Sequence, residues 1–287
     1  METDVLAVAG KKITPTAKRM AANAGVDVRA LEGTGIGGKV TKTDVARAGA
    51  RPAAAASALP AGVKRVPLTP MRRIIAERMS SSKYQAPHYY ITIEADMSAG
   101  KALRGQLPFK VSYNDLVLYA TTRALCEFPA VNAQWAGDAI NQMPDINLGV
   151  AVALPTGLIV PVIKKAQTLS LEEMSKAAKA LAEKAQNNKL LPDDYTGNTF
   201  TVSNLGAYGV DHFTAIINQP DSAIIAVGQM KDRVVVIDGG IHIRPIMKLT
   251  ISSDHRVVDG ALAAQFMGRL KEILEAADFV GDSHAGM

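Results

Sequence analysis

Residues 252–260, with the sequence SSDHRVVDG, carry side chains that proton-transfer chemistry needs. An unperturbed imidazole has a pKa of about 6.5, so a histidine such as His255 can accept a proton at neutral pH and return it. Asp259 stands four residues later, where its carboxylate could orient the imidazole or instead anchor the turn by pairing with an arginine. We therefore single out His255 as a candidate general base.

The segments on either side of this turn predict rigid elements. Residues 246–251 (IMKLTI) form a short apolar and β-branched run, which is typical of a buried strand. After the turn, apolar residues recur at helical spacing, at Leu262, Phe266, Leu270, Ile273 and Leu274. His255 is thus expected where a strand meets a helix, an arrangement in which rigid elements hold a loop-borne side chain.

Composition bounds the class of protein. The 287 residues suit one large domain plus a small module, and 48% apolar with 21% charged residues is typical of a globular protein. No run of about 18 uncharged apolar residues exists, so no membrane span is expected. The acidic start METD lacks the basic region of a secretory signal, which favours the bacterial cytoplasm or an organelle matrix or stroma.

Cys126 is the single cysteine, which excludes an internal disulfide and favours a reducing compartment. It lies in an apolar helical pattern, so we predict a core position. No set of Cys and His has the spacing of a metal site, and no metal is expected. The other histidines, interpreted as structural or surface groups, are His88, His212, His242 and His284.

Positive charge is concentrated near the N-terminus. From Lys11 to Arg51 there are nine Lys or Arg and three acids, an excess of six, whereas the whole chain carries +5. A basic small module implies an acidic partner surface. Nucleic acid is a weaker interpretation, because no aromatic residue lies in this segment to stack on bases.

Residues 11–48 predict two small helices around a glycine-rich loop. Thr14 before Pro15 is typical of a helix start, and Thr43 is expected to cap the second helix. The loop, residues 33–38 (GTGIGG), matches G-x-G-x-x-G. A dinucleotide site needs a strand before the loop and a long helix directly after it, and neither is predicted here, so we reject that interpretation.

The remaining chain divides into three parts: residues 1–10, an N-terminal tail; residues 49–63, an Ala/Pro-rich tether; and residues 64–287, a large domain. In the large domain, helix and strand patterns interleave irregularly, which favours a mixed-sheet α/β fold. Helix starts are predicted at Thr69-Pro70 and at the capping-box pairs Ser112–Asp115 and Ser170–Glu173. Strands are predicted at residues 88–97, 146–154, 157–163, 199–203, 223–227, 234–237 and 241–251, with a hairpin turn at 238–240.

Ordered motifs along the chain resemble one protein family. Residues 11–48 contain TP, KR, GVD, GTG and GKVTK, and residues 64–287 contain MRRIIAERM, PHYY, NTFTVSNLG, AIINQP and DHRVVDG. These motifs are similar to those of the dihydrolipoamide acyltransferases, the second components of 2-oxo acid dehydrogenase complexes. The resemblance implies a peripheral subunit-binding domain at 11–48 and an acyltransferase domain at 64–287 with a fold like that of chloramphenicol acetyltransferase.

The resemblance also assigns catalytic roles. His255 matches the general base that takes the proton from an attacking thiol, and Ser203 matches the hydroxyl that donates to the oxyanion. Asp259 would orient the imidazole or form a structural ion pair. Family trimers place this hydroxyl and the histidine of adjacent subunits at one interface. We therefore expect a homotrimer, and a larger core stays open because the last residues, 279–287, lack the family's apolar tail.

Candidate binding residues follow from the same comparison. Arg78, Ser82 and Lys83 could reach the phosphates of coenzyme A. The family's lipoyl domain, with its D-K-A turn, has no counterpart here, so the lipoyl group is expected in trans or from a domain missing from this chain.

The basic residues Lys18, Arg19 and Lys39 match those with which the family holds dihydrolipoamide dehydrogenase or the 2-oxo acid decarboxylase. Ile36 stands where a basic residue is often found, and Lys39 replaces a frequent arginine. The choice between the two peripheral subunits therefore stays open.

The motifs around residues 203–206 and 215–218 favour acetyl as the acyl group, as in the pyruvate dehydrogenase complex. Three other interpretations remain: branched-chain acyl specificity, a non-catalytic scaffold subunit of such a complex, and an acyltransferase acting on a small molecule. The basic module argues against the last, because a small-molecule enzyme has no use for a docking domain.

Overall fold

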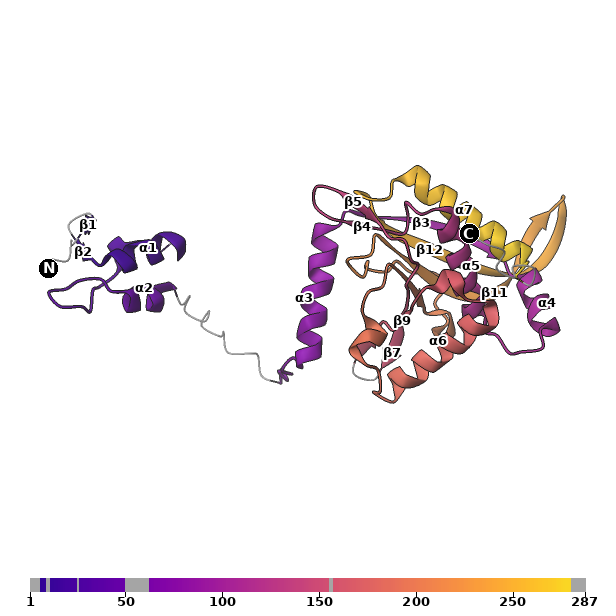
Figure 1. Cartoon of the computed structure of the whole chain (residues 1–287), viewed down its shortest axis with the longest axis horizontal. Helices are drawn as coiled ribbons and strands as arrows, with labels where there is room; N and C mark the ends of the chain where they lie inside the picture. Colours follow the sequence, from indigo (N-terminus) through magenta and orange to yellow (C-terminus); the bar gives the residue numbers. More distant parts are fainter. Residues whose placement is uncertain (1–5, 9–10, 25, 50–61, 155–156, 280–287) are drawn as a thin grey trace. The chain divides into compact units, whose positions relative to one another are not determined.

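The computed structural model describes residues 6–8, 11–24, 26–49, 62–154 and 157–279 (Figure 1). The chain divides into two compact units, Met1–Pro67 and Leu68–Met287. Most of the predicted tether and the C-terminal tail after Phe279, with His284, lie outside the described residues.

The first unit contains the two predicted helices, α1 (Pro15–Ala24) and α2 (Lys42–Gly49), and a short antiparallel pair, β1 (Leu6–Val8) and β2 (Lys11–Ile13), that the sequence did not predict. A 3₁₀ turn, Val28–Ala30, lies between the helices. The core of this first unit is small and is formed by Ile13, Ala17, Ala21, Val40 and Val45.

The predicted cap at Thr43 is wrong, because α2 already begins at Lys42. Thr41 precedes the helix, and its amide and hydroxyl donate to the Asp44 carboxylate at 2.8 and 2.9 Å. The start of α2 is therefore stabilised by the Asp44 carboxylate in its first turn, which binds Thr41, and not by the Thr43 hydroxyl.

The second unit is built on a six-stranded mixed sheet in the order β3-β12-β11-β10-β6-β9. β10 runs parallel to β6 and β11, and the other pairs are antiparallel. The strands are β3 (His88–Asp96), β6 (Leu148–Val150), β9 (Val162–Ile163), β10 (Phe200–Asn204), β11 (Ala223–Ile237) and β12 (Gly240–Asp254). Two small pairs stand beside it: β4 (Ala133–Trp135) with β5 (Ile140–Gln142), and β7 (Val152–Leu154) with β8 (Gly157–Ile159). The predicted mixed-sheet α/β fold is confirmed.

Five helices accompany this sheet: α3 (Pro70–Gln85), α4 (Ser98–Gln106), α5 (Tyr113–Glu127), α6 (Leu171–Gln186) and α7 (Gly260–Ala276). α5 packs against α6 and α7, and α7 packs against β3 (Figure 1). The helix starts follow from their caps: Thr69 caps α3, and the pairs Ser112–Asp115 and Ser170–Glu173 form capping boxes on α5 and α6.

The three strands predicted between 223 and 251 are one long hairpin, β11 with β12. Its turn, Asp238–Gly239, has positive φ at both residues, 49° and 78°, as the Asp-Gly signal predicts for a type I′ turn. The outer half of the hairpin projects beyond the flanking helices (Figure 1). The sequence pattern thus predicted strands correctly in this region, but the predicted strands are shorter than those of the structure.

Cys126 is exposed, so its predicted core position is wrong. The buried side of α5 includes Leu118, Thr122 and Leu125, and Cys126 falls on the outer side at the end of this helix. Among the described residues, no helix is long and apolar enough to cross a membrane. The same residues contain no group of three or more His, Cys, Asp or Glu that could hold a metal ion.

A buried carboxyl, Asp221, joins the segment before β11 to β10 and the residues that precede it. Asp221 is 2% exposed and accepts hydrogen bonds from Asn198 Nδ2 at 2.7 Å and Thr201 Oγ1 at 2.6 Å. Burial raises the pKa of Asp221 to about 7, against the hydrogen bonds from Thr201 and Asn198, which lower it. The carboxyl is thus more readily protonated in the folded chain than in the unfolded one.

This raised pKa predicts a pH dependence of stability. The unfolded carboxyl titrates near pH ~4, so the stabilising contribution is present below that pH and is lost as pH rises through about 7. The free energy of unfolding of the wild type should fall, relative to Asp221→Asn, by up to about 1.4 kcal/mol per pH unit in this window. Urea unfolding at several pH values between 5 and 8 measures the difference, and parallel curves for the two proteins would contradict it.

Candidate active site and docking module

His255 follows the last residue of β12, in the turn that leads to α7. Its backbone amide donates to the Pro87 carbonyl at 3.1 Å, which attaches the turn to the start of β3. The imidazole is exposed, as a group that meets a substrate has to be. The predicted junction of a strand and a helix is confirmed at this residue.

Tyr89 supports this turn and was not singled out from the sequence. Its ring lies 4.8 Å from the imidazole of His255, centroid to centroid, at 58°. Its hydroxyl donates to the Asp259 carbonyl oxygen at 2.6 Å, and burial raises the pKa of Tyr89. The Tyr89 side chain therefore contacts both ends of the turn, at His255 and at Asp259. The β3–β12 register, with Tyr89 opposite Ser253, explains the contact, and this register is not visible in a single sequence.

The ion pair of the turn is made by Asp254, not by Asp259. Both oxygens of the Asp254 carboxylate accept from the Arg256 guanidinium, at 2.6 to 3.2 Å, and Asp254 is only 3% exposed. The guanidinium also lies 4.9 Å from the ring centroid of Trp135. Asp259 instead caps α7, accepting from the Leu262 amide at 2.9 Å. The chain thus gives the Asp259 carboxylate a capping role.

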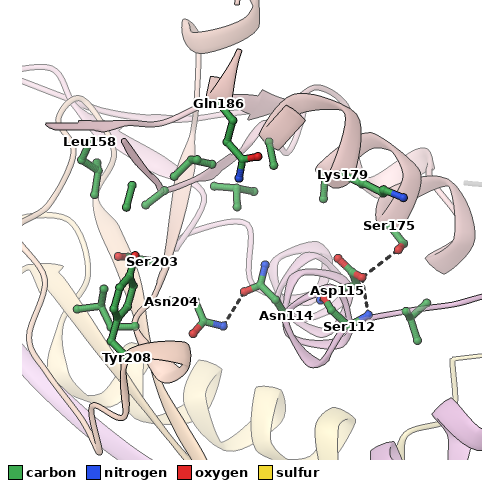
Figure 2. Close-up of a pocket in the computed structure, with 18 of the residues that line it drawn as sticks. Ser112, Asn114, Asp115, Leu158, Ser175, Lys179, Gln186, Ser203, Asn204 and Tyr208 are labelled. Carbon is green, nitrogen blue, oxygen red and sulfur yellow. Dashed lines mark hydrogen bonds between the residues drawn. The ribbon is translucent and has the colours of Figure 1, made fainter. Parts of the chain in front are cut away.

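Ser203 lies on β10 and lines an open cavity of about 650 Å³ (Figure 2). Asn204 beside it is fixed, because its amide donates to Asn114 Oδ1 at 2.9 Å and its oxygen accepts from the Gly206 amide at 2.8 Å. Across the cavity, the Asp115 carboxylate joins α5 to α6 by accepting from Ser175 at 2.9 Å. The cavity is walled by strands on one side and by two helices on the other (Figure 2).

Ser203 and His255 do not meet within one chain. Ser203 is opposite Ala226 on β11, which is opposite Thr250 on β12, and His255 lies five residues further along. At about 3.3 Å per residue and about 4.8 Å between strands, the two Cα atoms are roughly 20 Å apart. A thiol ester carbonyl cannot contact both side chains of the same chain.

Ser82, a candidate for coenzyme A, is 0% exposed and donates to the Ile217 carbonyl at 2.6 Å. A buried hydroxyl with this partner cannot present itself to a phosphate, so that assignment is wrong. Lys83 contacts the Tyr90 hydroxyl, and Arg78 donates to the Gln219 carbonyl at 3.0 Å. Both cations remain at the surface of the unit.

The His88 imidazole is neutral and binds the segment that contains Ile217, the residue that also accepts from Ser82. The Ile217 amide donates to its Nε2 at 3.1 Å, so the ring proton is on Nδ1, which donates to the Ala86 carbonyl at 2.7 Å. Burial lowers the pKa of His88. This histidine is structural, as its sequence context indicated.

In the small unit that contains residues 11–48, the predicted basic residues lie on helix α1 and on the glycine-rich loop. Lys18 and Arg19 are exposed on α1, and Lys39 is half-exposed at the end of the glycine-rich loop. The loop is fixed by Asp44, whose carboxylate accepts from the amides and hydroxyls of Thr34 and Thr41 at 2.7 to 3.1 Å. The Thr34 hydroxyl, with these other donors, holds the pKa of the Asp44 carboxyl far below its ordinary value.

The comparisons with known proteins agree with this geometry. Residues 60–280 match the family model described as 2-oxoacid dehydrogenases acyltransferase (catalytic domain), and residues 11–46 match the e3 binding domain. The chain belongs to the 2-oxoacid dehydrogenase acyltransferase family.

Curated relatives of this chain are components of pyruvate dehydrogenase complexes. The chain is 44% identical to the acetyltransferase component of the mitochondrial pyruvate dehydrogenase complex of Schizosaccharomyces pombe, over 91% of this chain and 60% of that protein. For the corresponding component of Rickettsia conorii, identity is 37% over 92% and 66% of the two chains. The chain thus spans about two thirds or less of the length of these relatives.

Two crystal structures of relatives share the fold. A probable dihydrolipoamide acetyltransferase from Listeria monocytogenes superposes with a TM-score of 0.72, at 35% identity, over 79% of this chain and 99% of that one. The dihydrolipoamide acetyltransferase of Azotobacter vinelandii gives 0.71 at 34% identity, over 75% and 92%. In that enzyme, the catalytic roles of a serine, a histidine and an asparagine four positions after the histidine have been investigated.

The Asp44 interactions predict a local stability effect. In Asp44→Ala, the amides of Thr34 and Thr41 lose their acceptor, and their hydrogen exchange should approach that of unprotected amides. Because the folded pKa is lowered, the stabilisation in the wild type is present above pH ~4 and is lost as pH falls below it.

Hydrogen exchange with mass spectrometry on the whole chain measures this effect. Glu32→Ala, which removes an exposed acid beside the same loop, is the matched control and should leave both amides protected. Retained protection in Asp44→Ala would contradict the anchoring role.

Proposed function

We propose that this chain is the acyltransferase component of a 2-oxo acid dehydrogenase complex and transfers an acetyl group between a dihydrolipoyl thiol and coenzyme A. The observation that carries the proposal is the family match over residues 60–280. Within that match, the Tyr89 ring packs on His255, and Ser203 lines a cavity walled by strands and helices. Acetyl is favoured because the curated relatives are components of pyruvate dehydrogenase complexes.

The proposed reaction moves one proton and one acyl group. His255 takes the proton of the attacking thiol, and the thiolate attacks the carbonyl carbon of the thioester. The Ser203 hydroxyl donates to the oxyanion of the tetrahedral intermediate. When the intermediate collapses, the bond to the other sulfur breaks and the imidazolium returns its proton to that sulfur. The reaction is reversible, because both sides contain one thiol and one thioester.

The active form is proposed to be an oligomer, with a homotrimer as the minimum. The roughly 20 Å between Ser203 and His255 in one chain supports this, because a second copy has to supply one of the two groups. The hairpin tip supports it as well, since Val234, Val236, Ile241 and Ile243 are 69–79% exposed and form two cross-strand pairs on one face. A cubic core has been solved for a related pyruvate dehydrogenase complex.

Asp259 is proposed to act by fixing the start of α7. It occupies the position, four residues after the histidine, that an asparagine occupies in the Azotobacter vinelandii enzyme. Both side chains can accept from a backbone amide at a helix start. A capping role therefore accounts for either residue at this position.

Coenzyme A is proposed as a substrate, with Arg78 and Lys83 as its candidate phosphate contacts. The lipoyl group would be supplied in trans or by a part of the protein outside this sequence. The module at 11–46 would bind dihydrolipoamide dehydrogenase, through Lys18, Arg19 and Lys39, and the decarboxylase is the alternative partner. The bacterial and mitochondrial relatives support a bacterial cytoplasm or an organelle matrix as the compartment.

Two substitutions test the catalytic assignment. His255→Ala should lower kcat for acetyl transfer from acetyl-coenzyme A to dihydrolipoamide by about 10²–10⁴-fold, through loss of the base. Ser203→Ala should lower it by about 10²–10³-fold with KM little changed, because the hydroxyl acts on the transition state.

The controls separate the competing functions. His242→Ala changes an exposed histidine of the hairpin and should keep full activity. A folded wild-type oligomer without acetyl transfer would favour the non-catalytic scaffold. Faster transfer of a branched-chain acyl group would change the specificity and keep the two residues.

The hairpin tip tests the assembly. Val236→Lys with Ile241→Lys replaces one exposed cross-strand pair by two like charges, which should release monomers and abolish transfer activity together. Light scattering after size-exclusion chromatography measures the mass. His242→Lys, on the opposite face of the ribbon, is the control and should assemble normally. A double variant that stays oligomeric and active would contradict the role of this face.

A further inference from the structure

The glycine-rich loop of the small unit is built to be rigid. The Gly35 amide donates to the Lys39 carbonyl at 2.9 Å, and the Gly38 amide donates to the Gly35 carbonyl at 2.9 Å. Gly37 and Gly38 both have positive φ, 69° and 73°. A Cβ at Gly33 would lie 2.4 Å from the Gly38 carbonyl oxygen, so the base of the loop is closely packed. Asp44 of α2 fastens the loop through two hydrogen bonds, from the amide and the hydroxyl of Thr34.

The tip of this rigid loop is an isoleucine that touches almost nothing. Ile36 is 95% exposed, the highest value among the large apolar side chains of the described residues. The unit has a small core formed by other residues, and Ile36 takes no part in it. Folding of the module therefore does not account for an apolar residue at this position.

Exposed basic residues lie on the same small unit as Ile36. Lys39 stands at the base of the same loop, and Lys18 and Arg19 are exposed on α1. Protein interfaces commonly have an apolar centre and a polar or charged rim. Because the loop is already fixed, little conformational entropy is lost when its tip is buried by a partner.

We propose that Ile36 is an apolar anchor that inserts into a hydrophobic recess on the acidic surface of dihydrolipoamide dehydrogenase. This rests on the proposed docking function and adds to it: the basic residues supply attraction, and Ile36 supplies a contact that salt does not screen. The partner's surface is thereby defined chemically as an apolar hollow with carboxylates at its rim. Dihydrolipoamide dehydrogenase, the E3 component of such complexes, is favoured over the decarboxylase because the module matches the e3 binding domain.

The test is calorimetric titration of the whole chain with purified dihydrolipoamide dehydrogenase at two salt concentrations. Ile36→Ser should weaken binding about 10- to 100-fold at both, with the salt dependence of the wild type, because only apolar burial is lost. Ile36→Leu should restore most of the affinity. Lys39→Met should instead reduce the salt dependence.

The outcomes separate this inference from the docking function. Binding by the wild type with an unchanged affinity in Ile36→Ser would leave the docking function standing and overturn the anchor. An effect of Ile36→Ser that disappears at high salt would also overturn it. If the wild type does not bind the dehydrogenase, the partner assignment is wrong. Protection of the Thr34 amide against hydrogen exchange confirms that each variant keeps the loop.

Discussion

The pairing of β12 with β3 is the constraint on which the position of the His255 turn depends. This register places Tyr89 opposite Ser253 and His88 opposite Asp254, so the start of β3 meets the end of β12. From there the Tyr89 ring packs on His255 and the Pro87 carbonyl accepts from the His255 amide. A slip of one residue would move every side chain of β12 to the other face of the sheet. The position of the imidazole is therefore a property of strand pairing more than of the turn itself.

A second constraint is the distance that the sheet imposes between Ser203 and His255 in one chain. Ser203 lines a cavity formed by β10, α5 and α6, whereas His255 lies at the other end of the sheet's strands. Both residues are attached to the same sheet, which fixes their separation within one chain. Under the proposed trimer, a second copy would supply the group that completes each site.

Local chemistry in the sequence predicted a large part of this structure. The helix starts at Thr69, Ser112 and Ser170 depend on residues three apart, and the Asp238–Gly239 turn depends on two adjacent residues. These signals are short-range, and the structure has all of them. The strand-to-helix junction at His255 was predicted for the same reason.

Contacts between distant segments, the choice between two similar local partners and the buried side of a helix were not predictable in this way. The burial of Ser82 depends on the Ile217 carbonyl, 135 residues away, and the support of His255 by Tyr89 depends on sheet register. Asp254 looks no different in sequence from Asp259, yet only Asp254 pairs with Arg256. Cys126 has an apolar neighbourhood in sequence but falls outside the buried arc of α5.

The exposed hairpin tip has a consequence for the synthesis of the protein. A newly made single chain presents four large β-branched side chains on a two-stranded ribbon, all of them exposed. Such surfaces are prone to non-specific association and to recognition by chaperones. Slow expression at low temperature should therefore raise the yield of soluble protein, because it keeps the concentration of chains with this uncovered surface low.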